Sequence, residues 1–213
     1  MPALIVRRLG RVEYLPTWRR MRDFTLSRDD DTPGELWLVE HPPVFTLGQA
    51  GKREHLLNPG DIPVVRTDRG GQVTYHGPGQ LLVYVLIDLR ETGVGVRALV
   101  SALENSVIDL LADLGIVAAA RADAPGVYVG DAKIAALGLR IKRGRSYHGL
   151  ALNIDMDLSP YQRINPCGHA GMPVTQLHDL GSTASLEESA DRLVEKLAAR
   201  LGYTVGKITT EIP

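Results

Sequence analysis

The only thiol in the chain lies in a stiff, turn-forming segment, I-N-P-C-G-H, at residues 164–169. Pro166 fixes the backbone before Cys167, and Gly168 allows many backbone angles after it, which suits a thiol held at a loop for nucleophilic attack. A lone cysteine is more often a small buried apolar residue, so both interpretations stay open. A zinc site is disfavoured, because Cys167 and His169 are two residues apart and no second cysteine completes a ligand set.

A second candidate is Lys133, near the start of an apolar stretch. Strand alternation predicts that its side chain shares a face with Ala135, Leu137, Leu139 and Ile141. Burial there disfavours the charged amine, so one interpretation is a lysine with a lowered pKa that acts as a base or pairs with an acidic group. The other is an ordinary lysine whose amine reaches water from the start of the strand.

A third feature is the glycine-rich segment R-G-G-Q-V-T-Y-H-G-P-G-Q, residues 69–80. Glycines allow close backbone approach to a ligand, and exposed N–H groups there would hold a carbonyl or a phosphate. A tight hairpin loop explains the pattern equally well. The nucleotide-binding pattern G-x-x-x-x-G-K-[ST] is absent from the chain. His76 is either a residue that shapes a ligand site or an ordinary loop histidine.

Two further patterns remain open. A cysteine hydrolase needs a histidine base, and His76, His148, His169 and His178 are candidates by residue type. Residues 140–145, R-I-K-R-G-R, carry four cations, and they form either a docking patch for an acidic protein or a solvated turn.

Composition limits the class of protein. The 213 residues are 44% hydrophobic, which predicts one core and a single domain over residues 1–213. Twenty-four basic against 25 acidic residues give a net charge of −1, so neither nucleic acid nor an anionic membrane is an expected partner. A single cysteine excludes an internal disulfide and fits the cytosol. No apolar run approaches the ~20 residues of a membrane span, and the first residues are too short an apolar stretch for a signal peptide. We therefore expect a cytoplasmic protein.

Apolar spacing predicts the elements that must position these residues. Helical periodicity indicates helices over 14–27 and 96–114, and a capping-box pattern at Ser185 opens a third helix that ends at Gly202. Strands are predicted over 4–9, 35–40, 43–47, 63–67, 72–75, 80–89, 126–129, 132–141 and 146–154. Strand–turn–strand runs with few helices between them predict an α+β fold with a mixed, largely antiparallel sheet flanked by helices.

Three stretches, in this order, resemble one family. R-G-G-Q-V-T-Y-H-G-P-G-Q-L-L-V-Y at 69–84 is similar to the signature of the lipoyl(octanoyl) transferases. G-D-A-K-I-A-A-L-G-L-R at 130–140 resembles their catalytic-lysine strand. S-Y-H-G-L-A-L-N at 146–153, followed by I-N-P-C-G at 164–168, resembles their acyl-pocket strand and nucleophile loop. The likeness covers roughly residues 35–180.

The resemblance implies the fold of the biotin and lipoate protein ligase catalytic domain. It also implies transfer of an octanoyl or lipoyl group from acyl carrier protein to a lysine of a lipoyl domain, in 2-oxoacid dehydrogenase complexes or in the glycine cleavage H protein. Cys167 would be the acyl-thioester nucleophile and Lys133 its partner, with no cofactor and no metal. The acyl site would be lined by Arg69, Gly70, Gly71, Gln72, Val73, Thr74, Tyr75, His76, Ala136, Leu137, Gly138, Gly149, Leu150 and Ala151.

The chemistry fits these residue types. Leu137, Leu139, Leu150 and Leu152 could form apolar walls for the acyl chain. Oxyanion donors could come from the loop at Gly70 and Gly71 or from the turn at Cys167 and Gly168. The alternatives are an ATP-dependent lipoate ligase on the same fold, a cysteine-dependent thioesterase, and a non-catalytic protein that binds acyl or lipoyl groups. The last needs neither Lys133 nor Cys167.

Overall fold

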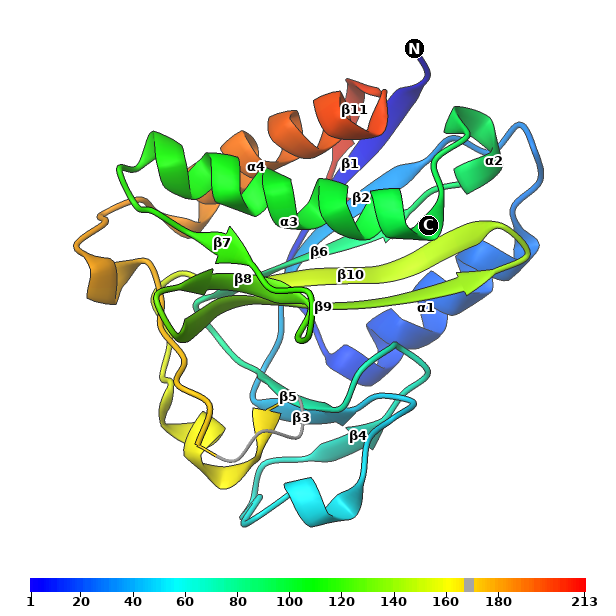
Figure 1. Ribbon diagram of the computed structural model, residues 1–213. Coiled ribbons are helices and arrows are strands. Elements are labelled where there is room, and N and C mark those ends of the chain that lie inside the picture. Colours follow the sequence, from blue (N-terminus) through cyan, green and yellow to red (C-terminus); the bar gives the residue numbers. More distant parts are fainter. Residues whose placement is uncertain (167–170) are drawn as a thin grey trace.

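The computed structural model describes residues 1–166 and 171–213, so the predicted nucleophile Cys167, together with Gly168 and His169, lies outside the described residues. In the described part an eight-stranded mixed sheet forms the centre of the molecule (Figure 1). Strand β1 pairs in parallel with β11 and β2, and every other neighbouring pair in this sheet is antiparallel. Its order is β11 (Thr204–Thr209), β1 (Ala3–Arg11), β2 (Glu35–Glu40), β6 (Gln80–Leu86), β10 (Arg145–Asn153), β9 (Ala132–Lys142), β8 (Gly126–Val129) and β7 (Ala119–Ala120).

Helices cover the two faces of this sheet (Figure 1). Helices α3 (Val96–Asp113) and α4 (Leu186–Leu201) pack side by side on one face, above the main apolar core. Helix α1 (Tyr14–Ser27) packs on the other face, where Met21 and Trp37 lie in a second core. A short helix, α2 (Leu89–Thr92), follows β6.

A small three-stranded sheet, β4 (Val64–Arg66), β3 (Val44–Leu47) and β5 (Val73–His76), lies beside the α1 face of the large sheet (Figure 1). Its own apolar core includes Phe45, Tyr75 and Tyr161. Short 3₁₀ turns at Arg53–His55, Ser159–Arg163 and His178–Leu180 complete the described elements. The glycine-rich segment therefore runs between the two sheets.

The α+β class and the mixed, largely antiparallel sheet are confirmed. Each predicted helix and strand is present, with its ends displaced by at most three residues. The capping box at Ser185 is formed, since its hydroxyl accepts from the Glu188 N–H and the Glu188 carboxylate accepts from the Ser185 N–H.

Two features of the sheet differ from the prediction. The strand predicted over 80–89 ends at Leu86, because Asp88 caps the short helix α2 by accepting from the Arg90 N–H at 3.0 Å. Strand β11 was not predicted. Its residues are largely exposed, so apolar alternation gives no signal, and its parallel pairing with β1 joins opposite ends of the chain.

A substitution at Gly149 tests how closely the central strands β10 and β6 approach each other. A Cβ atom built there would lie 2.0 Å from the Val83 carbonyl oxygen on β6. We expect Gly149→Ala to lower the free energy of unfolding by roughly 1–3 kcal/mol, the usual cost of overpacking. Gly95→Ser is the matched control, because Gly95 precedes α3 with φ −75° and open space around it, and serine is a good N-cap. Urea unfolding measures both variants. A Gly149→Ala midpoint equal to the wild type would contradict the close approach.

Candidate active site

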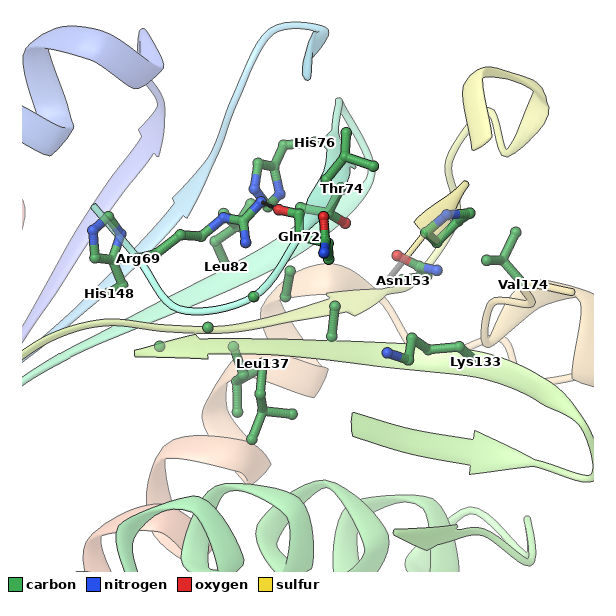
Figure 2. Close-up of a pocket in the computed structure, with 18 of the residues that line it drawn as sticks. Arg69, Gln72, Thr74, His76, Leu82, Lys133, Leu137, His148, Asn153 and Val174 are labelled. Carbon is green, nitrogen blue, oxygen red and sulfur yellow. Dashed lines mark hydrogen bonds between the residues drawn. The ribbon is translucent and has the colours of Figure 1, made fainter. Parts of the chain in front are cut away.

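An apolar pocket lies between the glycine-rich segment and strands β6, β9 and β10 (Figure 2). Two residues predicted to line the acyl site do not line this pocket: Gly70, whose N–H bonds to strand β9, and Tyr75, which packs in the core of the small sheet. The predicted residues that do line it are Arg69, Gly71, Gln72, Val73, Thr74, His76, Lys133, Ala136, Leu137, Gly138, Gly149, Leu150 and Ala151.

The floor of the pocket is made of small residues on paired strands. Ala136 is opposite Ala151 and Gly138 is opposite Gly149 in the β9–β10 ladder. Small side chains in a sheet face leave room for another group to lie directly on the backbone. Leu139 and Leu152, suggested as walls, instead pack in the core beneath α3 and α4. Their expected role in the pocket is therefore wrong.

Arg69 and Gly70 fasten the glycine-rich segment to both sheets. The Arg69 guanidinium donates to the Thr46 carbonyl at 2.6 Å and to the Gln72 carbonyl at 2.8 Å. The Gly70 N–H donates to the Leu139 carbonyl on β9 at 2.9 Å. Gly70 therefore cannot serve as an oxyanion donor, since its N–H is engaged in attaching the segment.

Lys133 faces the pocket because of an irregularity in β9. Val127 pairs with Ala135 and the next residue, Tyr128, pairs with Lys133, so Ile134 is an additional residue on β9. Such a bulge shifts the alternation by one position. Lys133 therefore lies on the pocket side with Ala136, and the predicted face shared with Ala135 and the three following apolar residues is wrong.

The Lys133 side chain is buried, with only 5% of the residue exposed, so the alternative of an amine reaching water is also wrong. Among its contacts, Nζ donates to the Pro125 carbonyl at 3.2 Å and lies 5.1 Å from the centroid of the Tyr128 ring. Gly126 makes space for it, because a Cβ there would lie 2.9 Å from Lys133 Cε. The lysine is held by packing on both sides.

Described residues on both sides of Cys167 reach this end of the pocket. Pro166 and Val174 both line it. The segment that follows Cys167 pairs with the Lys133 backbone: the Lys133 N–H donates to the Pro173 carbonyl at 2.9 Å, and the Lys133 carbonyl accepts from the Thr175 N–H at 3.0 Å. We call this the Lys133 end of the pocket; Asn153 and Val174 lie there with the lysine (Figure 2).

A buried chain of hydrogen bonds links the glycine-rich segment to the Lys133 end. His76 Nδ1–H donates to Gln80 Oε1 at 2.8 Å, and Gln80 Nε2 donates to Asn153 Oδ1 at 2.9 Å. Asn153 Nδ2 then donates to the Thr175 carbonyl at 2.9 Å. Each buried amide is satisfied by the next, so the chain fixes the two halves of the pocket relative to each other.

Three histidines around the pocket are buried and neutral at pH 7. Burial lowers the pKa of His41 to about 4 and that of His76 to about 3. His41 Nδ1–H donates to the Val12 carbonyl at 2.6 Å, which leaves Nε2 to accept from the Tyr84 hydroxyl at 2.7 Å. Burial also lowers the pKa of His148.

Asp68 anchors His148 from behind. Burial alone would raise the pKa of Asp68, but donors from His148, Tyr147 and Trp18 outweigh it and hold that pKa well below its usual range. The His148 Nε2–Asp68 Oδ1 distance is 3.0 Å and the Trp18 Nε1–Asp68 Oδ1 distance is 2.8 Å. The carboxylate thereby fixes helix α1 and strand β10 against each other.

Several pocket residues were not predicted from the sequence. Leu82 and Tyr84 could have been found, because β6 is apolar on both faces and its second face had no assigned partner. Tyr14, Asn153 and Val174 gave no such signal, since their place in the pocket depends on tertiary packing. His178, named as a possible base, is not among the residues that line the pocket, and its side chain is 67% exposed.

The basic cluster at residues 140–145 is partly structural. Arg145 is half-buried and pairs with Asp88 at 3.1 Å and Asp30 at 3.1 Å. Lys142 and Arg143 are exposed at the β9–β10 turn. A docking patch would therefore rest on these two residues and not on Arg145. Within residues 1–166 and 171–213, no helix is both long and apolar enough to cross a bilayer.

The fold places the chain among proteins built like lipoate and biotin ligases. A bipartite lipoate protein ligase from Thermoplasma acidophilum has a similar structure, with a TM-score of 0.75 at 17% identity over 98% of this chain and 87% of that one. A biotin protein ligase from Aquifex aeolicus, in complex with biotin and ATP, has a TM-score of 0.60 at 13% identity over 95% and 71%. At such identities the likeness establishes the fold.

Sequence relatives narrow the class. The family model for the lipoyl protein ligase A/B catalytic domain matches residues 13–198. Proteins named octanoyltransferase from Azotobacter vinelandii and Chromohalobacter salexigens are 63% and 64% identical to this chain, over 99% of it and over 97% and 96% of their own lengths. The chain therefore belongs to the lipoyl protein ligase A/B catalytic-domain family and, within it, to the octanoyltransferases, which are acyltransferases.

The buried histidines predict how stability depends on pH. In the unfolded chain a histidine has a pKa near ~6.5, so below that pH the unfolded state binds more protons than the folded state. The contribution of the neutral histidines to the free energy of unfolding is therefore fully present above pH ~6.5. It falls as the pH drops towards 5, by up to about 1.4 kcal/mol per pH unit for each buried neutral histidine. Urea unfolding at pH 7.5, 6.5, 5.5 and 5.0 measures this slope.

One variant tests how much of this pH dependence comes from His76. His76→Gln should lower the difference in bound protons between the unfolded and folded states by about one, because the folded-state pKa of His76 is lowered to about 3 and the amide does not titrate. His178→Gln, at an exposed imidazole, is the matched control. An unchanged slope in His76→Gln would show that this imidazole is not kept neutral by the fold.

Proposed function

We propose that this protein transfers an octanoyl group from acyl carrier protein to the lysine of a lipoyl domain in the cytoplasm, through a thioester on Cys167. In this proposal residues 1–213 act as one catalytic domain. The observation that carries it is the buried Lys133 at one end of an apolar pocket, where residues on both sides of Cys167 also lie. The names of the similar octanoyltransferases agree with it.

The pocket suits a medium-length saturated chain. An octanoyl group has about seven CH₂ or CH₃ units, and each contributes ~0.8 kcal/mol when buried. Complete burial would therefore contribute at most about 5–6 kcal/mol to binding. The floor of small residues, Ala136, Gly138, Gly149 and Ala151, leaves space for the chain directly over the backbone.

The reaction then takes two steps. The Cys167 thiolate attacks the donor thioester carbonyl, an acyl-cysteine forms, and the carrier leaves as a thiolate that takes up a proton from Lys133, which leaves the lysine amine neutral for the second step. The acceptor lysine amine attacks this second thioester, an amide forms, and the Cys167 thiolate is released. No nucleotide is needed, because the acyl group arrives as an activated thioester.

Lys133 is the proposed partner in both steps. For a cysteine thiol in general, a fall in pKa from ~8.5 to ~6.5 raises the thiolate fraction roughly 25-fold at pH 7, but it lowers the intrinsic nucleophilicity about eightfold. The net gain is only about threefold. A neutral Lys133 amine that takes the proton from the attacking lysine contributes more, since a general base accelerates such a step by ~10²–10⁴.

The tetrahedral intermediates also need donors for the developing oxyanion. Gly70 is excluded, because its N–H donates to the Leu139 carbonyl. The proposal therefore assigns this role to the N–H of Gly71, which lines the pocket, or to the turn at Cys167 and Gly168. Removal of one such donor typically costs ~10²–10³ in rate.

Proposed acceptors are lipoyl domains of 2-oxoacid dehydrogenase complexes and the glycine cleavage H protein. The exposed pair Lys142 and Arg143 is a candidate docking point for the acidic carrier protein. An ATP-dependent ligase remains the alternative on this fold, since a similar structure is titled as a lipoate-protein ligase bound with ATP. A thioesterase is the other rival, distinguished by release of the acyl group to water.

The first experiment tests the covalent intermediate. The protein is mixed with octanoyl-acyl carrier protein, without ATP or acceptor. The reaction is quenched in acid, and the intact mass of the protein is measured by mass spectrometry. We expect one added octanoyl group that hydroxylamine removes and that is absent in Cys167→Ser. Transfer to a lipoyl domain without any adduct would contradict the intermediate, and transfer that requires ATP would favour the ligase.

The second experiment separates the two roles of Lys133. Lys133→Met keeps the apolar stem and removes the amine from a site that is 5% exposed. In single-turnover assays we expect acylation to fall only about threefold, and transfer from pre-acylated enzyme to a lipoyl domain to fall by ~10² or more. Lys207→Met, at an exposed lysine of strand β11 that does not line the pocket, is the matched control. Unchanged transfer in Lys133→Met would remove the general-base role.

A further inference from the structure

The end of the pocket opposite Lys133 is lined by aromatic residues, and no role has been assigned to them. Arg69, Leu82 and His148 lie at this end in Figure 2. Tyr84 belongs to it as well, since it pairs with Gly149 and its ring centroid is 6.3 Å from that of His148. We call this the aromatic end.

Tyr14, the first residue of α1, closes this end. It lines the pocket and is 4% exposed. Its ring stacks on His76, with centroids 5.8 Å apart and planes 10° from parallel. It also meets His41 edge-on at 5.1 Å. A ring held on two sides in this way is a rigid wall.

The Tyr14 hydroxyl is buried and neighbours the Thr67 hydroxyl, which is also buried. Burial raises the pKa of Tyr14 more than Thr67 lowers it, so the phenol is neutral at pH 7. A hydroxyl does not help to bind a methyl terminus, so the part of Tyr14 suited to meet an alkyl chain is its ring.

The length of the pocket accommodates an eight-carbon chain. Asn153 at the Lys133 end and Gly149 at the aromatic end are four residues apart on β10, or about 13 Å at the rise of a strand. An extended octanoyl group has seven C–C bonds of about 1.5 Å, which span roughly 9 Å along the chain and therefore fit between these two positions.

We propose that Tyr14 sets the upper limit of acyl chain length, with its ring acting as the end wall against the terminal methyl group. This inference rests on the proposed acyl transfer and specifies its substrate class as saturated chains of about eight carbons. Longer chains are rejected, because they would have to displace a ring that is packed on His76 and His41.

The test compares acyl groups of eight, ten and twelve carbons. Acyl-enzyme formation is measured from the three acyl carrier protein thioesters, and binding of the three free fatty acids is measured by calorimetry. In Tyr14→Ala the ten-carbon to eight-carbon ratio should rise about 15-fold, the factor expected from burying two further CH₂ groups. Tyr14→Phe keeps the ring and should keep the wild-type preference.

Other results would overturn the inference. An equal loss for all three chain lengths in Tyr14→Ala would show a merely structural tyrosine. A changed preference in Tyr14→Phe would show that the hydroxyl, and not the ring, selects the chain. If Tyr14→Ala does not fold by thermal melting, Tyr14→Leu decides, because it also shortens the wall and predicts a gain for ten carbons.

The two proposals fail separately. Absence of octanoyl transfer without ATP would remove the proposed function, while the fatty-acid binding preference would still test the end wall. Transfer with an unchanged chain preference in both Tyr14→Ala and Tyr14→Leu would remove the end wall and leave the function.

Discussion

The architecture of the site depends on one close approach, that of the glycine-rich segment to strand β9. The Gly70 N–H bonds to the Leu139 carbonyl, and a Cβ on Gly138 would lie 3.1 Å from Arg69 Cδ and 3.2 Å from the Gly70 carbonyl oxygen. Arg69 completes the attachment with its bonds to the small sheet. Because the segment lies so close to β9, the pocket is confined to an apolar slot between the segment and strands β6, β9 and β10.

Different interactions form the two ends of that slot. At one end, the additional residue Ile134 turns Lys133 away from the helices and into the slot, where burial holds it. At the other end, the buried ring of His41 packs against those of Tyr14, His76 and Tyr84. Keeping His41 and His76 neutral avoids two further cations beside the Arg69 guanidinium, which is itself held by the Thr46 and Gln72 carbonyls.

Most of the fold could be predicted from the sequence, because apolar spacing fixes which elements form and which faces they bury. The bulge in β9 could not. Alternation extrapolated from Ala135 and Leu137 places Lys133 on the wrong face, since the pattern carries no sign of one extra residue. The position of Tyr14 could not be predicted for another reason. It depends on how α1 packs against the sheet, which Asp68 fixes through Trp18 and His148, and not on its neighbours in the chain. Local sequence made Cys167 and Lys133 candidates but left a structural interpretation open for each, and their pairing came from the resemblance of three separated stretches to one family.

The slot also bears on the choice between transfer and hydrolysis. In the proposed mechanism the acyl chain would lie in the slot, and the thioester carbonyl would lie at the Lys133 end. Water would compete there with the acceptor amine, which is the better nucleophile. A base that is buried among Pro125, Tyr128 and Gly126 has little freedom to reach out to bulk water. This burial agrees with the proposed role of Lys133, which is to accept the proton of an incoming lysine in a transferase rather than to activate bulk water in a thioesterase.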